Sequence, residues 1–206
     1  MELEERLEQR CAEVGIAPNH LENVKNFLAP LRTYHLETYE HSIRVGLKAS
    51  QIAEYMHLNP KPALYGVLHD VGKSKIPLSV LDKKVGFNSQ DMEVMKNHTL
   101  EGFNILLAGR YMFSAALAVS HHRFQPNCYP LILPGLPFPL NDKTRGAITL
   151  YSRIVSIADH NDALRRKNDR FGGKDMSLEE GKRIMISLNK DQERLIEELY
   201  RAGVLT

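Results

Sequence analysis

Apolar residues recur every three to four positions along almost the whole chain, a spacing that predicts successive amphipathic α-helices. Apolar stripes run through positions 3–14 and 21–31, and a third extends from about Tyr34 to Met56. No segment alternates apolar and polar residues as a half-buried strand would. The pattern therefore predicts an all-α fold, and we find no internal repeat or linker.

Further helices are expected downstream, with recognisable start and stop signals. A short, very apolar helix should cover residues 63–71, with Gly72 placed to end it. Asn88 or Ser89 can cap a helix that extends to Leu106. The remaining helices are expected over the following segments: 115–121, about 143–158, the residues after Ser177 (with Glu180 completing a capping box), and 195–199.

The segment between Arg123 and Asn141 interrupts this pattern. It contains prolines that neither a helix interior nor a central strand would accommodate, at positions 126, 130, 134, 137 and 139. We expect one long irregular loop here, and loops of this length in compact domains are often functional.

Composition narrows the class of protein. The 206 residues suit one domain, and a formal net charge of +2 gives no argument for a nucleic-acid partner. Nowhere do about eighteen apolar residues run together, and the first ten residues contain no apolar signal core. Cys11 and Cys128 are too far apart for a paired-thiolate motif. We expect a cytoplasmic protein without a membrane or DNA partner.

Histidines and acids supply the candidate chemistry. His69 and Asp70 directly follow an apolar run, and Asp159 follows the apolar stretch "RIVSIA". Of nine histidines, five lie at the ends or inner faces of predicted helices: His41, His69, His98, His121 and His122. Imidazole and carboxylate together form a nitrogen-and-oxygen ligand set that suits iron, manganese or zinc. Glu37, one turn before His41, reads equally well as a ligand or as a surface residue.

The order of these residues resembles a known family. His41, then His69-Asp70, then Asp159 is similar to the HD phosphohydrolase superfamily. The motifs "HDVGKSKIP", "HTLEGFNIL", His121-His122 and "IADHNDAL" resemble the HD-GYP subgroup, whose characterised members are metal-dependent phosphodiesterases of cyclic di-GMP. The resemblance covers roughly Tyr34 to Ser177. It implies an HD-domain helical bundle, which we place over residues 31–206, and it does not account for the accessory helices predicted in residues 1–30.

The resemblance also implies roles for individual residues. One divalent ion would be held by His41, His69, Asp70 and Asp159, and Asp70 would bridge to a second ion held by His98, His121 and His122. Glu37 stands where some members add a carboxylate for a third ion. Asp70 and Lys73 would be catalytic, and Lys73, Tyr129 and Arg170 would contact the substrate. Iron or manganese is the expected metal, with zinc left open.

The chain departs from the HD-GYP pattern after the histidine pair. Members carry His-His-Glu and then Asp-Gly-x-Gly-Tyr-Pro, whereas this chain reads "HHRFQPNCYP". Arg123 replaces the glutamate, and only Tyr129-Pro130 remain of the tripeptide. Further along, "NDRFGGKDMS" is similar to the family's Arg-Pro-Tyr segment, which is the basis for Arg170.

The expected activity is hydrolysis of cyclic di-GMP or a related cyclic dinucleotide by a hydroxide that bridges two metal ions. The altered loop leaves two alternatives open. One is an HD phosphohydrolase for another nucleotide or phosphoester, and the other is an inactive metal-containing module that binds a nucleotide or a protein. A homo-oligomer, or a regulatory protein bound through residues 1–30, is also left open.

Overall fold

The structure, a computed structural model, describes residues 2–137, 139–165 and 176–206, and every regular element in them is helical. The all-α prediction is confirmed. The elements are α1 (Leu3–Glu13), α2 (Pro18–Tyr34), α3 (Leu36–Tyr55), α4 (Pro60–Leu64), η1 (Tyr65–Leu68), η2 (Val71–Lys75), α5 (Leu78–Leu81), α6 (Ser89–Ala108), α7 (Met112–Ser120), α8 (Asp142–Arg165), α9 (Leu178–Leu188), η4 (Lys190–Gln192) and α10 (Glu193–Arg201).

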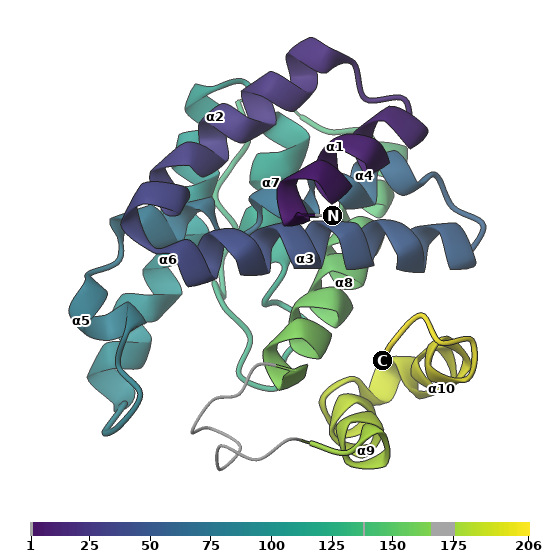
Figure 1. The fold of residues 1–206 in the computed structure, drawn as a ribbon. Helices are drawn as coiled ribbons and strands as arrows, with labels where there is room; N and C mark the ends of the chain where they lie inside the picture. The colour runs from purple at the N-terminus through teal and green to yellow at the C-terminus, as the bar shows by residue number, and fades with distance from the viewer. Residues whose placement is uncertain (1, 138, 166–175) are drawn as a thin grey trace.

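Helix α3 lies at the centre of the fold and is buried on two faces (Figure 1). One face, which includes Ile43 and Leu47, packs in a core cluster with α1, α2, η1, α6 and α7. The other, which includes Val45 and Ile52, packs in a second cluster with α8, α9 and α10. The two buried faces explain why the apolar stripe of this helix is wide.

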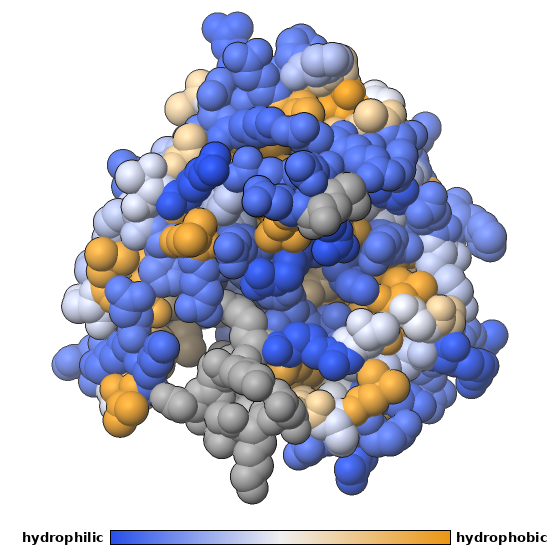
Figure 2. Space-filling model, viewed as in Figure 1, coloured by the Kyte–Doolittle hydropathy of each residue, from blue (hydrophilic) through white to orange (hydrophobic). Residues whose placement is uncertain are grey.

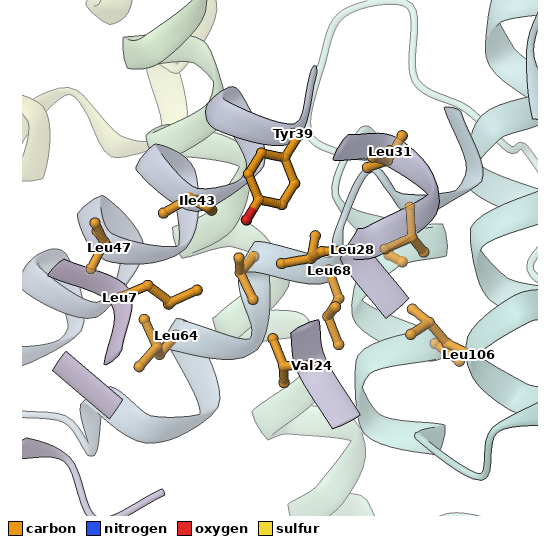
Figure 3. Close-up of a cluster of buried hydrophobic side chains, with 14 of the residues drawn as sticks. Leu7, Val24, Leu28, Leu31, Tyr39, Ile43, Leu47, Leu64, Leu68 and Leu106 are labelled. Carbon is orange, nitrogen blue, oxygen red and sulfur yellow. The ribbon is translucent and has the colours of Figure 1, made fainter. Parts of the chain in front are cut away.

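The first two helices belong to the first core cluster (Figure 3). Leu7 of α1 and Leu28 and Leu31 of α2 are almost completely buried there, together with Leu64 and Leu68. Burying each of these leucine side chains contributes on the order of 2 kcal/mol. Residues 1–30 therefore share a core with the helices that follow them, and the predicted boundary at residue 30 stays a prediction.

The predicted helix over residues 63–71 is wrong in its detail. The chain forms the short α4 and then the tighter 3-10 segments η1 and η2, and Gly72 lies inside η2. Gly72 is needed for close packing, because a Cβ there would lie 2.0 Å from the His98 carbonyl oxygen and 2.3 Å from the Gly102 backbone nitrogen. Contact between two backbones, which sequence periodicity does not report, decides the conformation here.

Other predicted signals are confirmed. The Asn88 side chain accepts hydrogen bonds from the backbone N–H groups of Gln90 and Asp91 and caps α6. The Ser177 hydroxyl accepts from the Glu180 N–H at 3.2 Å at the start of α9, which is one of the two bonds of the predicted capping box. Between α7 and α8 the described residues of 123–141 form an irregular loop. The short helix α5 and the turn η4 were not predicted.

Most of the face shown in Figure 2 is hydrophilic, with apolar side chains in separate spots. No helix in the described parts of the chain combines the length and the hydropathy required to cross a bilayer.

Candidate metal centre

Seven of the predicted ligands meet in the interior of the protein, although they come from positions 41 to 159. His41 is on α3, His98 is on α6 and Asp159 is on α8. The other four stand at element ends: His69 and Asp70 join η1 to η2, and His121 and His122 follow α7. Their side chains form three groupings in which the ligand atoms lie within 4.8 Å of one another.

The carboxylate of Asp70 lies between two sets of histidines. Its Oδ2 is 3.3 Å from His69 Nε2 and 3.5 Å from His41 Nε2. Its Oδ1 is 3.3 Å from His98 Nε2 and 4.0 Å from His121 Nε2. Asp159 Oδ1 approaches the first set and lies 3.1 Å from His41 Nε2. The two oxygens of one buried side chain thus face two different imidazole sets.

Three of the imidazoles are oriented by the backbone of their own helical turn. In each, the ring Nδ1–H donates to the carbonyl oxygen three residues earlier. The pairs are His69 with Gly66 (2.9 Å), His98 with Met95 (2.6 Å) and His121 with Ala118 (2.6 Å). A neutral ring with its proton on Nδ1 carries a lone pair on Nε2, so these bonds turn the Nε2 atom of each ring towards the centre.

The charge states of the buried groups leave these acceptors without a donor. Burial lowers the pKa of His98 to about 4 and that of His121 to about 3, so both rings are neutral at neutral pH. The pKa of Asp70 lies well below its usual range, because the attraction of His69 and Lys73 outweighs the effect of burial. For His69, burial lowers the pKa but the Asp70 carboxylate outweighs it and raises the pKa overall.

The donor set fits divalent cations. Five buried atoms of the proposed ligands have no hydrogen-bond partner among the described residues: Nε2 of His41, His69, His98 and His121, and Oδ1 of Asp70. A buried polar atom without a partner is costly. The neutral rings of His98 and His121 also point their Nε2 lone pairs at Asp70 Oδ1. Two acceptors therefore face each other with no proton between them. A cation bound between nitrogen and oxygen satisfies both sides, and such mixed sets suit iron, manganese or zinc.

Asp162 orients His41 and was not singled out from the sequence. Its Oδ2 accepts from His41 Nδ1 at 2.6 Å, and its Oδ1 accepts from Arg44 Nε at 2.7 Å. Burial would raise the pKa of Asp162, but the hydrogen bonds from His41 and Arg44 lower it to about 2. The available signal was its position one turn after Asp159 on the same helix.

A second polar group supports His122. The Gln125 side-chain amide lies 2.6 Å from His122 Nδ1 and 2.9 Å from His160 Nε2. Tyr129, predicted to contact substrate, stacks on the His122 ring with centroids 4.5 Å apart. His160 was not among the five histidines singled out from the sequence, and it also lies 3.4 Å from the side-chain oxygen of Asn189, 29 residues later.

The other predicted site residues lie at the edge of the cluster or beyond it. Lys73 Nζ is 2.6 Å from Asp70 Oδ2, and its side chain is 18% exposed. Glu37 is exposed and belongs to none of the three groupings. A third ion at Glu37 stays a prediction, tested by the metal-to-protein ratio of Glu37→Ala. Arg170 falls outside the described residues. His35, which was also not singled out from the sequence, caps α3 by accepting from the Thr38 N–H.

We expect the stability of chelator-treated protein to fall as pH decreases from 6.5 towards 4. The pKa values of His98 and His121 are lower in the folded protein than the ordinary 6.5, so the unfolded chain binds more protons in this range. Their contribution is present above pH 6.5 and is lost as pH falls, by about 1.4 kcal/mol for each pKa unit. The pKa of His69 is raised in the folded protein, so this group opposes the loss of stability as pH falls. It is a single group, and the two histidines with lowered pKa values are expected to outweigh it.

Urea unfolding between about pH 7.5 and about pH 4.5 measures this dependence. The matched control is His57→Asn, at an exposed histidine. This variant should show the same change of unfolding free energy with pH as the unmodified protein. A free energy of unfolding that stays level over this range would contradict the assignment of neutral, buried imidazoles.

Comparison with known proteins agrees with this geometry. The HD domain family model matches residues 38–164. A cyclic di-GMP phosphodiesterase from Thermotoga maritima is 31% identical over 149 residues, which are 68% of this chain and 37% of that protein. A 3'3'-cGAMP-specific phosphodiesterase 2 from Vibrio cholerae is 31% identical over 162 residues, which are 75% of this chain and 29% of that protein.

Solved structures show the same fold. The crystal structure of the HD domain of the L. monocytogenes phosphodiesterase PgpH matches with a TM-score of 0.62 at 18% identity, covering 87% of this chain and 95% of that one. The same domain in complex with cyclic-di-AMP matches with a TM-score of 0.60 at 17% identity, covering 87% and 94%. The chain spans about a third of the length of the curated relatives it matches.

Proposed function

The chain belongs to the HD domain family, and from this premise we propose that it is a metal-dependent phosphohydrolase that opens a phosphodiester bond of a cyclic dinucleotide. The observation that carries the proposal is the position of Asp70, whose two oxygens face separate histidine sets. One carboxylate placed in this way suits a bridge between two ions. Cyclic di-GMP is the first candidate substrate, and relatives named for cyclic di-GMP and 3'3'-cGAMP support this class.

Each residue of the cluster has a role in this proposal. His41, His69, Asp70 and Asp159 would hold one ion, and Asp70 with His98, His121 and His122 would hold the other. When bound, two such ions supply Lewis acidity, lower the pKa of a water molecule and offset charge on the phosphate oxygens. Asp162 and the backbone carbonyls hold the imidazoles in place, which keeps the donor set rigid.

Lys73 is proposed to contact the phosphate. Its ammonium group lies on Asp70 at the margin of the buried cluster, where its side chain retains some exposure to solvent. A positive donor at that place can stabilise negative charge that develops on phosphate oxygens. Tyr129 stacks on the ring of His122, which is a proposed metal ligand. A substrate in contact with Tyr129 would therefore lie next to the metal centre.

A different phosphoester is the second candidate, and the loop after α7 favours it. Arg123 is exposed where the HD-GYP pattern has a glutamate, and Leu131 and Ile132 are 79% and 86% exposed. Loops on a rigid scaffold shape substrate pockets. If the protein does not hydrolyse cyclic di-GMP, we expect this altered loop to select a different phosphoester as substrate. An inactive binding module is the third candidate.

The experiment is hydrolysis by the manganese- or iron-loaded chain. Cyclic di-GMP, 3'3'-cGAMP and cyclic di-AMP are each incubated with the protein, and the linear product is followed by chromatography. We expect a linear dinucleotide from cyclic di-GMP, and none from the matched Asp70→Asn protein. Turnover of another phosphoester alone would support the second candidate, a phosphohydrolase with a different substrate. Bound metal without turnover on a broad phosphoester panel would support the third, an inactive binding module.

A further inference from the structure

A cavity lies at the opposite end of α7 from the histidines. Its volume is about 610 Å³, within the size range of small-molecule sites. Its walls come from α2, the start of α4, Tyr65 and the turn Gly109–Tyr111 that leads into α7. None of the proposed metal ligands lines it, so it is distinct from the metal centre.

The charged groups around this cavity are all of one sign. Lys61 and Arg110 line it together with His20, and no aspartate or glutamate does so among the described residues. Lys61 Nζ donates to the Gly15 carbonyl oxygen at 2.9 Å. The Arg110 guanidinium makes no hydrogen bond or ion pair with a described residue, and its backbone is left-handed with φ of 64°. A cavity lined in this way attracts an anion.

Unsatisfied donors converge on the same cavity. The first three residues of α7, Met112 to Ser114, line it, and Tyr111 provides no side-chain cap for their backbone N–H groups. Ser114 is 4% exposed, yet its hydroxyl forms no hydrogen bond within the described parts of the chain. Orphan N–H groups and the positive end of the helix dipole together form a preferred place for a phosphate oxygen.

Aromatic rings form the remainder of the wall. Tyr65 and Tyr111 meet edge to face with centroids 6.4 Å apart, and Phe113 lines the cavity beside them. All three rings are half-buried, so each keeps a surface against which a planar ring can pack. The ligand class that uses both the donors and the rings is an aromatic molecule that carries a phosphate.

We propose that this cavity binds a nucleoside monophosphate, with the phosphate at the start of α7 near Ser114 and Arg110 and the base against Tyr65 and Tyr111. The site is separate from the proposed hydrolysis of a cyclic dinucleotide and does not depend on it. A chain that fails to cleave any cyclic dinucleotide can still bind at this cavity.

Titration calorimetry of the metal-loaded full chain with guanosine 5'-monophosphate tests the proposal. Inorganic phosphate and guanosine, used as separate probes, should each bind at least about tenfold more weakly, because each lacks one half of the recognised groups. Arg110→Gly and Ser114→Ala should each weaken binding of the monophosphate about tenfold, because each loses a donor to a charged group. Both should leave the metal content unchanged.

Two controls make the result decisive. His57 is exposed and also left-handed, with φ of 56°, so His57→Gly repeats the backbone change of Arg110→Gly away from the cavity and should bind normally. Asp70→Asn should also bind normally. The proposal is overturned by absence of binding, by equal affinity for inorganic phosphate or guanosine, or by binding that is lost in Asp70→Asn but survives Arg110→Gly and Ser114→Ala.

Discussion

Asp70→Asn is expected to remove most of the bound metal and to abolish hydrolysis, because it takes the charge from a side chain whose two oxygens face separate histidine sets. Mutation of a group that merely supports a metal ligand typically costs 10–100-fold in metal affinity or activity, so loss of a shared ligand should cost about 100-fold or more. Elemental analysis of the purified protein gives the metal content, and product formation from cyclic di-GMP gives the activity.

The matched control for this change is Asp142→Asn. That side chain is 95% exposed at the start of α8, so the same chemical change there should alter neither quantity. Asp70→Ala should lose metal as well, since it removes both oxygens. An Asp70→Asn protein that retains its full metal content would refute the bridging assignment, even if its activity were low.

Gly72→Ala is expected to have the largest effect on stability of any glycine-to-alanine change among the described residues. The new Cβ would meet the His98 carbonyl oxygen at 2.0 Å and the Gly102 backbone nitrogen at 2.3 Å, and backbone atoms cannot rotate away as a side chain can. Overpacking commonly costs 1–3 kcal/mol, so a contact this short should cost about 3 kcal/mol or more. Urea unfolding in the presence of chelator measures this cost without a metal contribution.

The same variant should also lose metal, because η2 must move away from α6 and separate Asp70 from His98. Gly146→Ala is the control. A Cβ at Gly146, within α8, would meet nothing within 4 Å, so the change should stabilise the helix by about 0.5–1 kcal/mol. A Gly72→Ala protein as stable as the unmodified chain would show that η2 and α6 are not in the close contact described here.

The sequence predicted features that depend on neighbouring residues, and it did not predict features that depend on contacts between distant segments. Helix positions followed from local spacing, and the Asn88 and Ser177 caps from the residues beside them. The segment from α4 to η2 did not, because its form depends on contact with α6, about thirty residues later. The sequence pattern describes the buried faces of single helices, and it does not report where two backbones touch.

The candidate site divides in the same way. The gathering of His41, Asp70 and Asp159 was anticipated by the family resemblance, since no local rule brings positions so far apart together. The resemblance gave no role to Asp162 or Gln125. Asp162 orients the proposed ligand His41 through a bond across 121 residues, and Gln125 contacts the proposed ligand His122 and also His160, 35 residues later. The cavity at the start of α7 left no motif, because its lining comes from short pieces of several elements.

The bonds from ring Nδ1 to backbone carbonyl oxygens have a consequence for how the centre is filled. At neutral pH an arriving ion meets the neutral rings of His98 and His121 with their donor atoms already turned inward, so neither ring must rotate or release a proton. Exchange of one metal for another can then leave the surrounding helices in place. Which ion a cell supplies at the time of synthesis need not be the ion that the protein finally carries.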